Sequence, residues 1–340
     1  MKRVRHFRLV LLAVLAVAAA ACHSGDDVSD SGGSSLTAAL ASVAGTDNTR
    51  LYFEWADLAR IRDLAAVTKD KPIGTSDVDH RRWGTLFGTG TGSLAPVAPK
   101  LADTIDLFSA RTAVLIGQPP QTAVRVDGVD AGTARAGLAR LGGKQGQVAG
   151  HDGMILGSDH EVDQTGGQAK LGLVNTFNKT AFDGDRVAFG EAEPAVGEAV
   201  NPGDHPLSTD AGVAAAASCL GGVLTATIAP GEKSHLAGAQ TVAIGVRDPA
   251  KGSDPAVEEL CLVASDKTAA DALESRVRQH ATTSAMSQVT RQPWSALVTS
   301  ITVTRAGDTA VRVELTNRPE RAANLLRAAL QNQDLLSLTG

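Results

Sequence analysis

Leu51-Tyr52-Phe53-Glu54-Trp55 is the densest group of aromatic residues in this chain of 340 residues. Because successive side chains of a strand point to opposite faces, alternation places Leu51, Phe53 and Trp55 together on one face. Asp57 follows, and its carboxylate can cap the start of a helix. The next apolar residues have helical spacing: Leu58, Ile61, Leu64 and Ala65. The stretch therefore predicts a core strand that leads directly into an amphipathic helix.

Further apolar segments, separated by turn residues, predict two similar blocks of secondary structure. Each block has the order strand, strand, helix, strand, strand, helix. The first opens with strands at 113–117 and 122–127, and the second opens with strands at 241–246 and 259–264. We therefore predict an α+β fold of two related lobes, each an antiparallel sheet covered by helices on one face.

The last predicted helix, 318–332, has the clearest local signals. Asn317 can cap it, with Glu320 three residues later, and Pro319 lies in the first turn. Apolar residues follow at positions i, i+3, i+4, i+7 and i+8 of one helical face. These signals predict that the helix begins immediately after the final strand.

Residues 1–22 have the features of an export signal. Four basic residues precede a thirteen-residue apolar run, which is too short to cross about 30 Å of hydrocarbon as a helix. The stretch Ala19-Ala20-Ala21-Cys22 resembles the bacterial lipobox, although Ala19 stands where the lipobox usually has Leu. The resemblance implies that cleavage exposes Cys22 and that this cysteine carries a lipid. Ordinary secretory cleavage is the alternative.

Changes in composition predict the domain boundaries. We assign 1–21 to the lipoprotein signal peptide and 22–35, which is rich in Gly, Ser and Asp, to a flexible tether. The two lobes follow at 36–205 and 206–340. With Cys22 assigned to lipid, Cys219 and Cys261 remain as an even pair, and we predict a disulfide between them. Two buried free thiols or a metal-binding pair are the alternatives.

The composition excludes several classes of protein. Apolar residues make up 43% and charged residues 20% of the chain, which is typical of a globular protein. The net charge is −5, and loss of the basic signal peptide makes the mature chain more acidic. This charge argues against nucleic acid as a partner and against a basic membrane-binding patch. Aromatic residues are only 3% of the chain, so surfaces for stacking bases or sugars are scarce.

The region between the predicted lobes carries a resemblance to known sequences. A strand and a helix are followed by Leu207-Ser208-Thr209-Asp210, a second helix that ends at Cys219, and another strand. This order is similar to a unit found in uncharacterised bacterial extracytoplasmic proteins, and the chain resembles unassigned actinobacterial lipoproteins of Ala/Gly-rich composition. The resemblance implies an α+β architecture and an envelope location, and it carries no activity to any residue.

Motifs for catalysis are absent from the sequence, so we predict that the protein is not an enzyme and needs no cofactor. It has no Gly-x-Ser-x-Gly, His-Glu-x-x-His or Gly-x-Gly-x-x-Gly motif. The nearest group of metal ligands is His151 and Asp152 with Asp159 and His160, whose loops a hairpin over 153–158 would bring together, with Gly153 in its turn. We interpret these residues as solvated loop residues, and a metal site there is the minor alternative.

Other polar and aromatic residues are predicted to be structural. The neighbouring carboxylates Glu191 and Glu193, and likewise Glu258 and Glu259, are interpreted as solvated surface groups. Trp83 and Trp294 are considered as anchors for a partner and are interpreted as packing residues under loops.

Three functions follow from these predictions, in order of preference. The first is a non-enzymatic binding or scaffolding role of a lipoprotein, anchored at the cell membrane through Cys22 and facing outside the cytoplasm, with an envelope protein as partner. The second is a carrier of a hydrophobic ligand such as a lipid, which predicts a large apolar pocket between sheet and helices. The third is a metal-dependent enzyme that uses the loops of 151–163.

Overall fold

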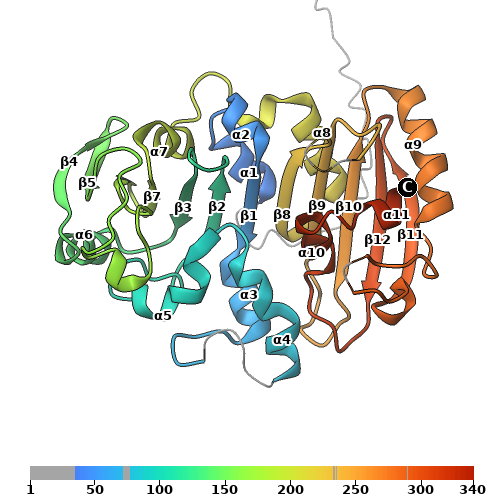
Figure 1. The fold of residues 1–340 in the computed structure, drawn as a ribbon, viewed down its shortest axis with the longest axis horizontal. Helices are drawn as coiled ribbons and strands as arrows, with labels where there is room; N and C mark the ends of the chain where they lie inside the picture. Colours follow the sequence, from blue (N-terminus) through green and yellow to red (C-terminus); the bar gives the residue numbers. More distant parts are fainter. Residues whose placement is uncertain (1–34, 72–76, 233, 235, 289) are drawn as a thin grey trace, which may run out of the picture. The chain divides into compact units, whose positions relative to one another are not determined.

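The strands assemble into one antiparallel sheet (Figure 1). The computed structural model describes residues 35–71, 77–232, 234, 236–288 and 290–340. Within these residues the sheet has 12 strands in the order β11-β12-β10-β9-β8-β1-β2-β3-β7-β6-β5-β4. The strands are β1 (Phe53–Asp57), β2 (Thr112–Ile116), β3 (Ala123–Asp127), β4 (Lys144–Val148), β5 (His151–Ile155), β6 (Lys179–Asp183), β7 (Arg186–Gly190), β8 (Val223–Pro230), β9 (Thr241–Arg247), β10 (Val257–Val263), β11 (Val298–Ala306) and β12 (Ala310–Asn317).

The predicted core strand, β1, joins the two halves of the chain. It pairs with β2 on one side and with β8 on the other, and Phe53 lies opposite both Ile116 and Ile228. The predicted organisation of two lobes with a sheet each is therefore not confirmed. As edge strands of separate sheets, β1 and β8 would each leave a row of unpaired N–H and C=O groups, and pairing β1 with β8 satisfies both rows at once.

The order of elements within each half matches the prediction more closely. In the first half β3 leads into a helix, α6 (Ala131–Arg140), and the returning strand β7 pairs with β3. In the second half β10 leads into a helix, α9 (Lys267–His280), and the returning strand β12 pairs with β10.

Helices cover both faces of the sheet, so the prediction of one covered face is wrong. The α-helices are α1 (Leu36–Ala41), α2 (Asp47–Leu51), α3 (Leu58–Ala65), α4 (Val78–Gly84), α5 (Ala98–Leu101), α6 (Ala131–Arg140), α7 (Glu193–Val200), α8 (Ala211–Leu220), α9 (Lys267–His280), α10 (Leu325–Gln331) and α11 (Leu336–Thr339). One apolar cluster contains residues of α3 to α6, a second contains residues of α1, α7 and α8, and a third contains residues of α9 to α11.

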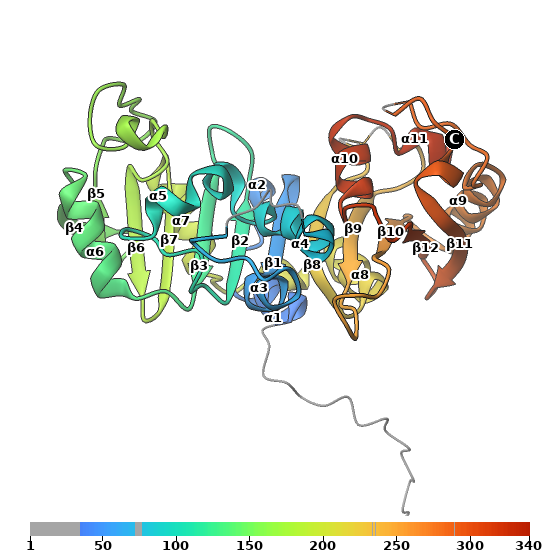
Figure 2. The ribbon, with the colours of Figure 1, turned by 90° about the horizontal axis from the view of Figure 1, so that it is seen from below.

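Strand β9 shows how these clusters divide between the faces. Val246 belongs to the first cluster and Ile244 to the third, and because they are two residues apart their side chains share one face. Ala243 belongs to the second cluster, on the opposite face. Figure 2 shows α9, α10 and α11 together on one side of β9 to β12. These strands carry apolar residues on both faces. Helices therefore cover both faces of the sheet.

The last helix begins later than predicted. Helix α10 starts at Leu325, and Asn317 is the final residue of β12 instead of a helix cap. The Asn317 side-chain NH₂ donates to Glu258 and to the Ala322 carbonyl, and its side-chain oxygen has no hydrogen-bond partner, so the residue does not cap a helix. None of the described helices is long and apolar enough to cross a membrane.

Candidate functional site

The predicted disulfide is confirmed. Cys219, in the last turn of α8, is bonded to Cys261 in β10, and their Cα atoms are 6.0 Å apart. Both residues are buried in the cluster between α8 and the sheet. The bond links α8 covalently to the sheet. The predicted lipid-attachment residue, Cys22, lies outside the described residues.

The four candidate metal ligands do not form a metal site. His151 Nε2 lies 2.8 Å from the Asn201 side-chain oxygen, and Asp152 accepts a hydrogen bond from Gln147. Asp159 pairs with Lys179 at 3.3 Å, and the His160 ring lies 4.0 Å from the Glu191 carboxylate. Among the residues that the structure describes, no group of three or more His, Cys, Asp or Glu side chains could hold a metal ion.

The predicted turn at Gly153 is wrong, and this explains the separation of the four candidates. The hairpin turn lies at Ala149 and Gly150, where φ is positive, and Gly153 sits in the middle of β5. A Cβ at Gly153 would lie 2.4 Å from the Thr180 carbonyl oxygen, so close strand packing requires glycine there. His151 therefore begins the strand and Asp159 follows its far end, with β5 between them.

A small pocket lies beneath the β2–β3 hairpin. Its volume is about 190 Å³, and its apolar wall includes Leu115, Val124 and Phe189. Its polar wall includes Thr122 and Glu191, and the buried hydroxyl of Thr122 has no hydrogen-bond partner. The pocket could hold a small molecule, but its volume is below the range of ordinary ligand sites.

The space between the sheet and α10 is filled. The cavity there has a volume of about 10 Å³, which is room for about one water molecule. Its lining mixes apolar residues with Thr225, Thr227, Glu258 and Arg327. A pocket of about 620 Å³ lies at β4 and β5, and polar side chains such as Arg135 and Asp152 line it.

Two buried glutamates anchor α10 to the sheet. Glu54 of β1 accepts hydrogen bonds from Arg327 at 2.9 Å, from the Tyr52 hydroxyl at 2.5 Å and from the Gly90 N–H at 2.9 Å. Burial, reinforced by the Glu54 charge, raises the pKa of the Tyr52 hydroxyl, so it remains a donor. The ion pair joins Glu54 of the central strand to Arg327 of α10, which lies 273 positions later in the chain.

Glu258 of β10 supplies the cap that α10 lacks locally. Its two oxygens accept the Leu325 N–H at 2.9 Å and the Leu326 N–H at 2.7 Å, and the Asn317 amide donates at 2.6 Å. Burial raises the pKa of Glu258, and these three donors act in the opposite direction. A carboxylate at a helix N-terminus is also favoured by the helix dipole.

The prediction that Glu258 and Glu259 are solvated is therefore wrong, because both are buried. Glu259 points to the opposite face of β10, where it pairs with Arg247, and Arg247 also contacts Glu314 at 2.6 Å. Strand alternation was the signal that sequence reasoning missed, since two adjacent carboxylates in a central strand must enter opposite faces.

The two tryptophans considered as partner anchors are packing residues, as interpreted from the sequence. Trp83 and Trp294 are fully buried. The Trp83 indole donates to the Gly252 carbonyl at 2.7 Å, and the neighbouring Arg82 donates to the Pro319 carbonyl. Helix α4 therefore helps to hold the two halves of the chain together.

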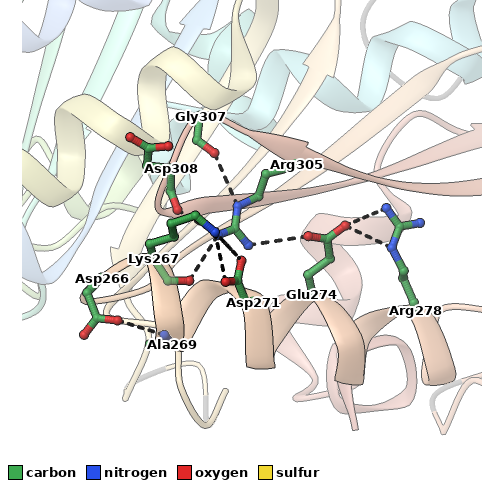
Figure 3. Close-up of polar contacts among 9 residues, drawn as sticks. All are labelled: Asp266, Lys267, Ala269, Asp271, Glu274, Arg278, Arg305, Gly307 and Asp308. Carbon is green, nitrogen blue, oxygen red and sulfur yellow. Dashed lines mark hydrogen bonds and ion pairs between the residues drawn. The ribbon is translucent and has the colours of Figure 1, made fainter.

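Strand β11 ends the sheet and carries one charged side chain, Arg305 (Figure 3). Arg305 reaches toward α9, where it pairs with Asp271 at 2.9 Å and Glu274 at 3.5 Å. Glu274 also pairs with Arg278 one turn later in α9, and Lys267 pairs with Asp271. This network fastens the end of β11 to the helix that covers one of its faces.

The other face of β11 is exposed. Ser300, Thr302 and Thr304 point away from α9 and are exposed to solvent. Among the residues that the structure describes, no strand pairs with the outer edge of β11. The end of the sheet at β11 is therefore a surface where another strand could add.

Comparisons with known proteins do not identify a family. No family model and no curated protein matches the chain. Crystal form III of TP0453 matches with a TM-score of 0.41 and 10% identity, over 85% of this chain and 97% of that chain. Crystal form I of TP0453 matches with a TM-score of 0.40 and 10% identity, over 86% of this chain and 98% of that chain. Similarity at this level assigns no role to any residue.

Proposed function

We propose that the protein is an extracytoplasmic lipoprotein that is tethered to the cell membrane at Cys22 and binds a partner at the envelope without catalysis. The observation that carries the proposal is the combination of a nearly filled space between the sheet and α10 with a sheet edge at β11 that has no strand neighbour among the described residues. A protein built in this way offers a surface to a partner and little space between the sheet and α10 to a ligand. We also propose that residues 36–205 and 206–340 are two related units that share one sheet.

The disulfide supports the proposed location. Disulfides persist in oxidising compartments outside the cytoplasm and are rare inside it. The bond between Cys219 and Cys261 therefore agrees with the export signal and with the resemblance of residues 19–22 to a lipobox. A diacylglyceryl group at Cys22 would hold the protein far more firmly than a single acyl chain.

The role of a lipid carrier receives less support. It predicts a large apolar pocket between sheet and helices, whereas the cavity between the sheet and α10 has a volume of about 10 Å³. The pocket of about 190 Å³ beneath the β2–β3 hairpin is too small for a pair of acyl chains. The role of a metal-dependent enzyme loses its basis, because β5 separates His151 from Asp159.

Native mass spectrometry of the mature chain, produced without its anchor and purified gently from an actinobacterial host, tests the binding role. We expect the mass of the bare polypeptide, reduced by two hydrogens for the disulfide. A bound mass of several hundred daltons that organic solvent releases would instead identify a carrier.

Fractionation of cells that produce the Cys22→Ser variant tests the tether. We expect the wild-type chain in the membrane fraction and the variant outside it. A variant that stays in the membrane fraction would show that the lipid anchor is not at Cys22.

A further inference from the structure

Strand β11 carries few of the features that usually protect a sheet edge. Natural edge strands are short or carry Lys, Pro or charged side chains that prevent another strand from pairing. Strand β11 has nine residues and neither Lys nor Pro, and its one charged residue, Arg305, is engaged with α9. At the opposite end of the sheet, β4 is only five residues long and begins with Lys144.

The sequence of β11 is suited to antiparallel pairing with itself. If two copies pair with Thr302 opposite Thr302, Ile301 lies opposite Val303 and Ser300 lies opposite Thr304. Small hydroxyl side chains then meet on the exposed face, and β-branched apolar side chains meet on the α9 face. Like charges do not oppose each other, because Arg305 would face Thr299.

The register shift at the start of β11 marks where regular pairing between two copies would end. A register shift between Val298 and Ser300 interrupts the ladder with β12, and the strand is regular from Ser300 to Ala306. The regular segment is centred close to Thr302 and Val303. A two-fold axis at Thr302 pairs Ser300–Thr304 of one copy with the same five residues of the other, all of them within the regular segment.

We propose that the partner at this edge is a second copy of the chain, which pairs β11 with β11 in antiparallel orientation and continues the sheet across both molecules. This proposal names the partner of the proposed binding role and therefore rests on it. A lipid tether would favour the pairing, because it confines the copies to one surface and raises their effective concentration. Such a contact is isologous and closes as a dimer, so it does not extend into a fibre.

Disulfide trapping tests the proposal at one residue. Directly opposed residues of antiparallel strands have Cα atoms about 4.5–5.5 Å apart, which is within reach of a disulfide. We expect Thr302→Cys to form a covalent dimer on mild oxidation, both in membranes and as the purified mature chain. Gln145→Cys, at an exposed position on the opposite edge strand, is the matched control and should stay monomeric. No dimer with Thr302→Cys, or equal dimer with both variants, would overturn the proposal.

Charge pairing gives a second test that does not depend on cysteine. Thr302→Lys and Thr302→Glu each place like charges opposite each other, and each should lose the dimer in sedimentation velocity. An equal mixture of the two variants should recover it. Failure of the mixture to recover a dimer that both single variants have lost would show that residue 302 does not face its counterpart.

The outcomes separate this proposal from the proposed function. Trapping with the purified mature chain does not need a membrane, so it can succeed even if Cys22 carries no lipid. Conversely, the protein can prove to be tethered and free of bound lipid and yet form no disulfide at residue 302. That result would support the proposed binding function and exclude a second copy of the chain as the partner at β11.

Discussion

The Glu258→Gln substitution tests the anchoring of the C-terminal helix. Both Glu258 oxygens face N–H donors, namely Leu325 and Asn317 at one oxygen and Leu326 at the other. A glutamine has almost the same shape, but its NH₂ group must replace one of these oxygens. In either orientation a donor then faces a donor, and at least one buried N–H loses its acceptor.

The magnitude follows from the bonds that are lost. A buried donor left without its partner costs about 1–3 kcal/mol, and bonds to a charged acceptor are stronger than neutral ones. If the amide faces Leu326, one bond of 2.7 Å is lost, and if it faces Leu325 and Asn317, two are lost. The substitution should therefore lower the free energy of unfolding by about 2–3 kcal/mol.

Urea denaturation measures this loss, and Glu320→Gln provides the control. Glu320 is exposed in the same C-terminal segment, so its substitution should change the free energy of unfolding by less than about 0.5 kcal/mol. Amide hydrogen exchange should locate the effect, with faster exchange in α10 of the Glu258→Gln variant. If Glu258→Gln and Glu320→Gln unfold at the same urea concentration as the wild-type chain, Glu258 does not cap α10.

Three other substitutions give further expectations. Replacing Cys219 and Cys261 together by Ala should lower the free energy of unfolding by roughly 4 kcal/mol, measured by urea denaturation, because their separation of 42 residues sets the loop entropy. Arg125→Met should lower the free energy of unfolding by about 3 kcal/mol in the same assay. The substitution removes the group that donates to the Ala199 carbonyl at the end of α7. Asp266 accepts the Ala269 N–H, which lowers the pKa of Asp266. Its stabilising effect is present above about pH 4 and is lost as the pH falls through the lowered pKa. The advantage of wild type over Asp266→Asn should therefore shrink in acid denaturation curves.

Local features of the fold could be predicted from the sequence because each depends on a few neighbouring residues. Asp57 caps α3 as predicted, since an acceptor one position before an apolar helical pattern needs no distant partner. The strand that contains Phe53 and Trp55 was predicted for the same reason. The disulfide could be predicted from export and from an even number of remaining cysteines, without any knowledge of geometry.

The arrangement of the sheet could not be predicted in this way. Nothing in residues 53–57 indicates that β1 pairs with β8, which lies about 170 positions later. The periodicity of each block is the same whether the blocks form two sheets or one. The pairing follows from satisfying two strand edges at once, and that is a property of the whole chain.

The start of α10 shows the same limit within a candidate site. A cap signal at Asn317 was present in the sequence, but Asn317 is the last residue of β12, where its side-chain NH₂ donates to Glu258 and its side-chain oxygen accepts from no helix N–H. Glu258 serves as the cap from a strand 67 residues earlier in the chain. Because Glu258 holds the N-terminus of α10 and Glu54 holds Arg327 within it, the helix is fixed to strands from both halves of the chain. The sheet, α4 and α10 thus link the two halves. The edge of β11, which no other described strand pairs with, lies outside all of these links. A partner that adds a strand there would need no rearrangement of the fold, which is why we place the binding role at this edge.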